Sequence, residues 1–377
     1  MLFTIPTKVY FGENIIEEAF TTERNLLPKV IMVVSTGGSI IRNGYTERVK
    51  EAIRKGRADA DIVEYHKICA NPDLEQVQEA VSIGKRKDVK LVVGLGGGSA
   101  MDAAKAIAVG IGSEEPVETY LLKGEEPGDT TLPIIAIPTT SGTGSELSKA
   151  AIISSKKHHL KSGIRGENVI PQVAVVDPTL TWSIPYQVTI ETGFDVLAHA
   201  IESYMAVKAN RLSEILSEEA IAVVAENLPT LINDLDNHQA RHNMSYASTL
   251  MGCNLLHIGT CLPHRMQYVI GVETGTSHGA GLLALYPAWL EQEYSVNQDK
   301  VKKVIMLLTG QKVGTSQEAR LEMERFLERL GQRKSLKDLG IQKDKIRELS
   351  GKVTGNIAND KLSVDDTVIE TIMTNAY

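Results

Sequence analysis

Runs of consecutive apolar residues that end in clusters of small residues constrain the fold more than any other feature of this sequence. They are VIMVV at 30–34, LVVGLG at 91–96, IIAIP at 134–138 and VAVV at 173–176. Strands that are apolar at every position belong to parallel sheets whose two faces are both covered by helices. Helical patterns follow the first two runs, so the first half predicts a Rossmann-like α/β domain.

The second half of the chain follows a helical rhythm. Beyond Pro185, long amphipathic stretches such as 211–232 and 317–331 dominate, and strand-like runs are scarce. A chain of 377 residues also exceeds the usual size of one compact domain. We place the boundary at Ser183, which gives an α/β dinucleotide-binding domain at 1–183 and an all-α metal-binding domain at 184–377.

Composition narrows the class of partner. The net charge is −7 with acids and bases intermixed, which gives no basic stripe for nucleic acid and no polybasic membrane anchor. An export signal and an apolar run of about 18 residues are both lacking, and the three cysteines show no CxxC pairing. We expect a cytoplasmic protein that acts on a small molecule.

Two loops that follow predicted strands are candidates for binding phosphate groups. In GLGGGSAMDAAK at 94–105, consecutive glycines precede a helix, where backbone amides can approach an anion closely. The alternative is a tight strand-to-helix turn, since the loop lacks a clean GxGxxG fingerprint. PTTSGTGSE at 138–146 follows the next strand with hydroxyls and small residues. Two such loops favour a dinucleotide over a monophosphate.

The turn STGGS follows the first apolar run, where an acidic residue normally binds the adenine-ribose 2′-hydroxyl. Gly37, Gly38 and Ser39 stand there instead, with Arg42 close behind. Without a carboxylate to repel it, a 2′-phosphate can be accepted, which favours NADP(H) over NAD(H). The alternative is that these residues only turn the chain.

A pair of polar residues interrupts a largely apolar helical stretch. In TGFDVLAHAIESY, Asp195 and His199 are four residues apart and therefore share one helix face, within reach of a common point. Two interpretations remain open for this pair alone. The carboxylate either holds a metal ion together with the imidazole, or it pairs with a buried histidine as part of the core.

Two further histidines extend this pattern downstream. His264 and His278 lie in separate helical segments, because Gly271 and Gly275 break the pattern between them and Ser277 can cap the second segment. Converging helix ends can bring both imidazoles to one point. One carboxylate and three imidazoles suit Fe(II), which we favour, or Zn(II), and suit calcium poorly.

The motifs together resemble the iron-containing (metal-dependent, group III) alcohol dehydrogenase family along the whole chain. They are GGGSAMDAAK, PTTSGTGSE, VVDP, TGFDVLAHAIESY, CLPHRM and SHGAGLLALYP. The resemblance implies a dehydroquinate synthase-like architecture that holds cofactor and metal across a cleft. The STGGS turn is similar to that of the NADPH-using branch. The family pattern places the metal ligands at Asp195, His199, His264 and His278.

The resemblance also implies a set of cofactor contacts. The pyrophosphate loop falls on Gly96, Gly97, Gly98 and Ser99, with Asp102 in the helix that follows. The loop beside the phosphates and the nicotinamide ribose falls on Thr139, Thr140 and Thr143, and a ribose-contacting lysine falls on Lys161.

Two positions depart from the family pattern. Many members carry a second histidine four residues after the third ligand, but this chain has Tyr268 there, either as a hydrogen-bond donor or as a packing residue. Arg265 follows that ligand in a region that is usually apolar. It either faces solvent or recognises an anionic substrate group such as a carboxylate or phosphonate.

The expected activity is NAD(P)H-linked reduction of a small aldehyde, or oxidation of a primary alcohol, by a homodimer. Asp195, His199, His264, His278 and Tyr268 are the candidate catalytic residues. The alternatives are a polyol (glycerol-type) dehydrogenase, a dehydroquinate-synthase-like lyase, and a non-catalytic nucleotide sensor whose metal is structural.

Overall fold

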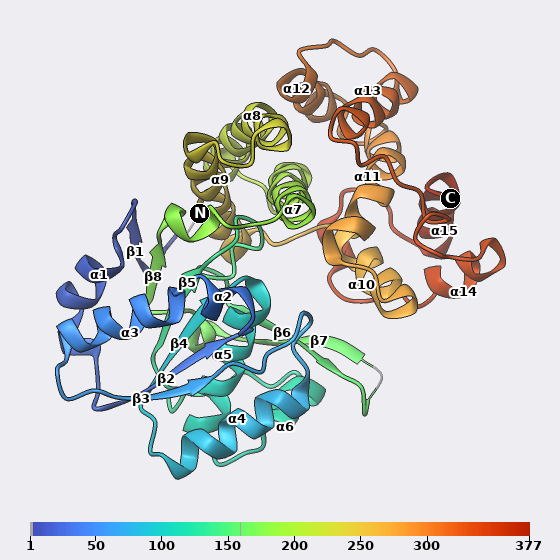
Figure 1. Ribbon diagram of the computed structural model, residues 1–377. Coiled ribbons are helices and arrows are strands. Elements are labelled where there is room, and N and C mark those ends of the chain that lie inside the picture. The colour runs from blue at the N-terminus through green and yellow to red at the C-terminus, as the bar shows by residue number, and fades with distance from the viewer. Residues whose placement is uncertain (1–2, 159) are drawn as a thin grey trace. The chain divides into compact units, whose positions relative to one another are not determined.

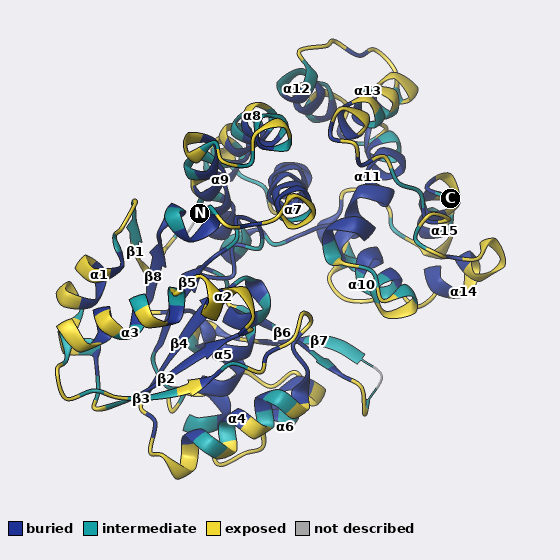
Figure 2. Cartoon of the chain, viewed as in Figure 1, coloured by how far each residue is buried: buried dark blue, intermediate teal, exposed yellow. Residues whose placement is uncertain are grey.

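The computed structural model describes residues 3–158 and 160–377, and the chain divides into two compact units, Met1–Ser183 and Ile184–Tyr377. Each unit has hydrophobic core clusters of its own. Figure 2 shows buried residues along the strands and the inner helix faces, and exposed residues on the outer faces.

The first unit is built on a parallel sheet. Among the described residues the strand order is β1-β8-β5-β4-β2-β3, and every neighbouring pair is parallel. The bounds are β1 (Lys8–Phe11), β2 (Val30–Ser35), β3 (Asp61–Tyr65), β4 (Leu91–Gly96), β5 (Ile134–Pro138) and β8 (Val173–Val176). The predicted Rossmann-like sheet is confirmed (Figure 1).

Helices cover both faces of this sheet, which explains why its strands are apolar at every position. Ile31 and Val33 pack in one core cluster with the helices α1 to α3, and Met32 and Val34 pack in another with α4 to α6. The helices are α1 (Ile16–Thr22), α2 (Ser39–Arg42), α3 (Tyr45–Gly56), α4 (Leu74–Arg86), α5 (Gly98–Gly112) and α6 (Val117–Lys123).

An antiparallel hairpin was not expected from the sequence. It consists of β6 (Ala150–Ser155) and β7 (Leu160–Arg165), whose residues join the same core cluster as α4 to α6. Its apolar residues are few and its turn is rich in lysine, so no long apolar run marked it as a strand pair.

The strand order places the predicted phosphate-binding loops at one edge of the sheet. β2 lies between β3 and β4, so the chain leaves β2 on one side and returns on the other. Such a reversal of strand order is where open α/β sheets bind nucleotides, at the carboxyl ends of the strands. The register pairs Ser35 with Leu95 and Gly96 with Pro138, so β2, β4 and β5 end side by side.

The described residues of the second unit form helices, which confirms the predicted helical half. Its core includes the fully buried Phe194, Tyr286 and Trp289, whose rings meet edge to face. The helices are α7 (Tyr186–Met205), α8 (Arg211–Asn233), α9 (His238–His257), α10 (Leu262–Thr274), α11 (His278–Glu293), α12 (Gln298–Thr309), α13 (Ser316–Arg329), α14 (Ile346–Ser350) and α15 (Asp366–Asn375).

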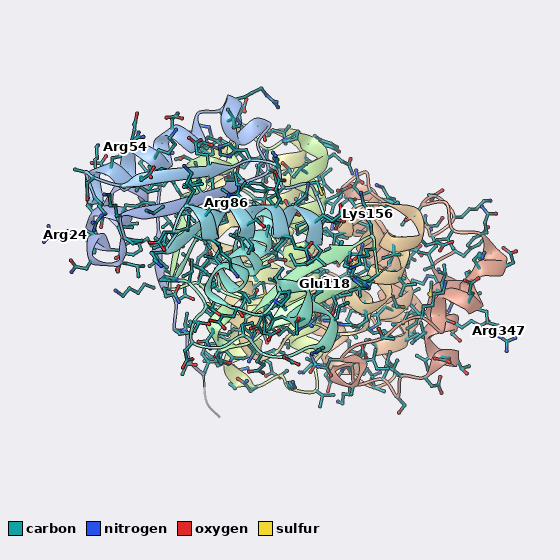
Figure 3. All side chains as sticks on the ribbon, turned by 90° about the horizontal axis from the view of Figure 1, so that it is seen from below. Arg24, Arg54, Arg86, Glu118, Lys156 and Arg347 are labelled. Carbon is teal, nitrogen blue, oxygen red and sulfur yellow. The ribbon has the colours of Figure 1, made fainter. Side chains whose placement is uncertain are left out.

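Charged side chains lie on the outer surfaces of both units. Arg54, Arg86 and Arg347 extend away from the ribbon in Figure 3. Bases and acids interleave there, as where Lys157 pairs with Glu118 at 3.0 Å. Among the described helices, none is both long enough and apolar enough to cross a membrane.

Candidate metal centre and nucleotide-binding loops

The glycine loop and the threonine loop pack directly against each other. The Thr139 amide donates to the Gly96 carbonyl at 2.9 Å, and a Cβ on Gly98 would lie 2.6 Å from the Thr143 Cγ2 atom. Only glycine therefore allows this approach. α5 begins at Gly98 without a capping side chain, so the first amides of the helix are available to an anion.

The turn after β2 also requires glycine. Gly37 and Gly38 have φ values of +68° and +54°, and a Cβ on Gly37 would lie 2.7 Å from the His66 carbonyl oxygen. Ser39 and Arg42 are exposed at the two ends of α2. The turn thus presents backbone and a hydroxyl, with a cation close by.

Asn71 joins two of the predicted cofactor contacts and was missed from the sequence. Its side-chain oxygen accepts a hydrogen bond from Lys161 Nζ at 2.8 Å, and its amide donates to Ser99 Oγ at 3.3 Å. Asn71 has a φ of +58°, a conformation that asparagine tolerates better than most residues. The order Asn-Pro ahead of a helix was the available clue.

Asp102, predicted to contact the cofactor, is engaged by protein groups. Its two carboxylate oxygens accept from Ser145 Oγ at 2.5 Å and from the Ile152 amide at 3.0 Å. Lys105, fully buried on the same helix, lies 3.9 Å away and donates to Ser145 Oγ at 2.9 Å. Burial lowers the pKa of Lys105 to about 8, against the opposing charge of Asp102. This network fixes the threonine loop and the hairpin to α5.

In the second unit, α7 presents Asp195 and His199 on one buried stripe. Both side chains are about 5% exposed, and Asp195 Oδ1 lies 3.6 Å from His199 Nε2. The polar pair therefore lies inside the helical core, where burial of a charge requires a compensating partner.

Two further helices bring the other predicted ligands to the same carboxylate. His264 Nε2 lies 3.4 Å and His278 Nε2 lies 3.5 Å from Asp195 Oδ1. α10 ends at the left-handed Gly275, and Ser277 caps the start of α11. The expectation that Gly271 also breaks the helix was wrong. α10 continues through it, and a Cβ there would lie 3.0 Å from Gln267 Nε2.

The separations of the donor atoms suit a metal ion better than they suit hydrogen bonds. Metal–ligand bonds of about 2.1 Å at tetrahedral angles place neighbouring ligand atoms about 3.4 Å apart. Asp195 Oδ1 is buried without a hydrogen-bond partner, and so is His199 Nδ1. The Nε2 atoms of His199 and His264 face each other at 2.9 Å, which requires a shared proton or a cation that takes both lone pairs. Asp195, His199 and His264 form the compact group, with the less buried His278 beside it.

Two residues behind these imidazoles were missed from the sequence. Glu202 Oε1 lies 2.6 Å from His264 Nδ1, and the side-chain oxygen of Gln267 contacts His278 Nδ1. Each acceptor fixes the proton on Nδ1 and leaves the Nε2 lone pair facing Asp195. Glu202 lies three residues after His199, and Gln267 lies three residues after His264, so helical spacing could have indicated both.

The electrostatics of the cluster favour a positive charge at its centre. Burial acts to raise the pKa of Asp195, but the facing imidazoles hold it well below its usual range. Burial lowers the pKa of His199 to about 4. Burial also acts to lower the pKa of His264, but the Glu202 and Asp195 carboxylates outweigh it and raise this pKa to about 9.

The two departures from the family pattern lie together beside the cluster. The Tyr268 ring is 6.1 Å from the His278 ring, and the Arg265 guanidinium carbon is 5.2 Å from the Tyr268 ring centre. Arg265 donates to Thr260 Oγ1 at 2.5 Å, and its Nε is buried without a hydrogen-bond partner. Among the described residues, no carboxylate lies within ion-pair distance of Arg265.

Family models match both units of the chain. The model described as iron-containing alcohol dehydrogenase matches residues 6–178, and the C-terminal model of the Fe-containing alcohol dehydrogenase family matches residues 189–377. The chain belongs to the iron-containing alcohol dehydrogenase family.

Relatives of this family member cover nearly its whole length. NADH-dependent butanol dehydrogenase A of Clostridium acetobutylicum is 28% identical over 369 residues, which is 94% of this chain and 92% of the relative. Sulfoacetaldehyde reductase of Bilophila wadsworthia is 29% identical, over 80% of this chain and 77% of the relative. The structure of a sulfoacetaldehyde reductase from Bifidobacterium kashiwanohense with NAD+ is 26% identical, with a TM-score of 0.88 over 100% of this chain and 99% of that one.

Proposed function

We propose that this iron-containing alcohol dehydrogenase family member reduces a small aldehyde to a primary alcohol with NAD(P)H, at a divalent metal centre in its second unit. One observation carries the proposal. The buried Asp195 Oδ1 has no hydrogen-bond partner and lies 3.4 to 3.6 Å from three imidazole Nε2 atoms. Such a set of donors is stable only around a cation.

Asp195, His199, His264 and His278 are the residues that would hold the ion, with Fe(II) favoured over Zn(II). When bound, such an ion supplies Lewis-acid polarisation of the aldehyde carbonyl and stabilises the alkoxide in the reverse direction. The three imidazoles offer their Nε2 lone pairs, and Asp195 offsets positive charge in a site from which bulk water is largely excluded. Oxygen and nitrogen donors without thiolates suit these metals.

The loops of the first unit are proposed to hold the dinucleotide. Gly96, Gly97, Gly98 and Ser99 would direct amides to the pyrophosphate, and Thr139, Thr140, Thr143 and Lys161 would contact the phosphates and ribose. Asp102 would act by holding the threonine loop. The acid-free turn at Gly37, Gly38 and Ser39 favours NADP(H), whereas the relatives named above use NADH or bind NAD+, so a direct comparison of the two coenzymes is needed.

Arg265 is proposed to recognise an anionic group on the aldehyde. Its guanidinium lies over Tyr268, close to His278, and lacks a carboxylate partner among the described side chains. Relatives named as sulfoacetaldehyde reductases support a substrate of this kind, since their substrate carries a sulfonate. Tyr268 would donate a hydrogen bond to the reacting oxygen in place of the missing histidine.

The test is an assay of purified protein loaded separately with Fe(II) and Zn(II). Neutral aldehydes, such as butanal, and anionic ones bearing a sulfonate, carboxylate or phosphonate are offered with NADPH or NADH, and loss of reduced coenzyme is followed. We expect turnover with at least one aldehyde and a preference for the anionic group. Ion binding without turnover on any substrate would instead favour the nucleotide-sensor alternative. Product analysis separates a polyol substrate or a lyase reaction without net coenzyme consumption.

A further inference from the structure

Glu202 is a fully buried carboxylate that the proposed chemistry does not use directly. It lies on α7, one turn after His199, and is 0% exposed. Its Oε1 atom accepts from His264 Nδ1 at 2.6 Å and from the Tyr286 hydroxyl at 3.0 Å. Its Oε2 atom accepts from the Cys261 amide at 2.7 Å. A buried carboxylate with three donors is held in a single orientation.

We propose that Glu202 is a positioning residue for the metal centre, which fixes the ring of His264 and supplies the second negative charge that a bound dication requires. This inference rests on the proposed function, because it assumes that the ion occupies the site built around Asp195.

The first part of the argument concerns the tautomer of His264. An ionised carboxylate only accepts hydrogen bonds, so the contact at 2.6 Å places a proton on Nδ1 of His264. The Nε2 atom is then free to donate its lone pair toward Asp195. The His264 ring also stacks on His199, with centroids 4.6 Å apart, so a rotated ring would disturb two ligands together. Such outer contacts typically change metal affinity by about 10- to 100-fold.

The second part concerns charge. Three neutral imidazoles and Asp195 leave a divalent ion with one uncompensated positive charge, in a cluster whose compact members are 3 to 5% exposed. Burying net charge is costly unless a counter-ion lies nearby. Glu202 brings the total to zero. The other fixed imidazole, His278, is held by the neutral amide of Gln267, so Glu202 alone among these two supports adds charge.

The experiment measures Zn(II) affinity by chelator competition and the visible spectrum of the Co(II)-loaded full-length protein. Glu202→Gln keeps the size of the side chain but removes its charge and opposes a donor to the Cys261 amide. We expect Zn(II) affinity to fall by about 10- to 100-fold and the Co(II) bands to shift. Glu202→Asp retains the charge at a longer distance from His264, and we expect an intermediate affinity.

The matched control is Glu293→Gln, at a second fully buried glutamate of the same unit. Burial raises the pKa of Glu293 to about 9, so glutamine imitates its protonated form. We expect unchanged affinity and spectrum in this variant. A folded Glu202→Gln protein with affinity within about two-fold of the wild type and the same bands would overturn the inference. If Glu202→Gln fails to fold, Glu202→Asp decides by the same criterion. Wild-type protein that binds Zn(II) but reduces no aldehyde would overturn the proposed function and leave the affinity comparison valid.

Discussion

The two units of the chain each bury a cluster of charged side chains, and the clusters differ in how their polar atoms are satisfied. In the first unit, Lys105 donates to Ser145, Ser148 and the Ala150 carbonyl, and Asp102 accepts from Ser145 and Ile152. In the second unit, an oxygen of Asp195 and a nitrogen of His199 have no hydrogen-bond partner.

This difference distinguishes a structural cluster from one that awaits a ligand. A closed network offsets the desolvation of its charges with protein groups alone. The metal cluster leaves donors unsatisfied and aims them at one point. Unpartnered buried atoms also occur elsewhere in the described chain, for example at Gln332 and Asn254. It is the convergence of several unsatisfied donors, and not a single orphan atom, that indicates function.

The largest effect is expected from opening the closed cluster. Lys105→Met removes a fully buried cation and leaves Asp102 without its charge partner, so unfolding free energy should fall by about 3–5 kcal/mol. Urea denaturation measures this loss, and the metal content of the folded fraction should stay the same. Loss of metal with unchanged stability would reverse the assignment of the two clusters.

A smaller effect is expected at Glu146, whose charge lies near the closed cluster. Burial raises its pKa from 4.5 to about 7, so the folded state binds more protons between these values and stability falls as pH rises from about 4.5 to 7. Glu146→Gln should remove this fall and stabilise the protein at pH 8 by up to about 3 kcal/mol. The exposed Glu115→Gln serves as the control. Equal pH profiles for wild type and Glu146→Gln would contradict the prediction.

The smallest effect concerns substrate recognition beside the open cluster. Arg265→Met should lower kcat/KM for sulfoacetaldehyde by about 10- to 100-fold, since a hydrogen bond to a charged group contributes about 1.5–3 kcal/mol. For butanal the change should stay within about two-fold, and Arg265→Lys should retain part of the preference. Equal losses on both aldehydes would assign Arg265 a packing role against Thr260 and Gly355.

Much of the fold could be predicted because burial on two faces leaves a simple trace in the sequence. The strands β2, β4 and β5 are continuous apolar runs, and the amphipathic pattern beyond Pro185 indicates helices. The hairpin of β6 and β7 could not be predicted in the same way. β6 alternates between buried and partly buried residues over a short length, and only its packing on the first unit's core reveals it.

The candidate site was partly accessible for the same reason. Helical spacing places Asp195 and His199 on one face, but whether His264 and His278 reach them depends on how α7, α10 and α11 pack. Supporting residues such as Asn71 and Lys105 act through contacts between segments far apart in sequence. Motifs indicate which residue types can do chemistry, and packing decides which of them meet.

The most direct test of the central claim is a titration of chelator-treated protein with Zn(II), followed by calorimetry. The account predicts one tightly bound ion per chain, affinity weakened by more than about 100-fold in His264→Ala, and parallel loss of aldehyde reduction in that variant. Binding of Zn(II) by His264→Ala with wild-type affinity and stoichiometry would contradict it.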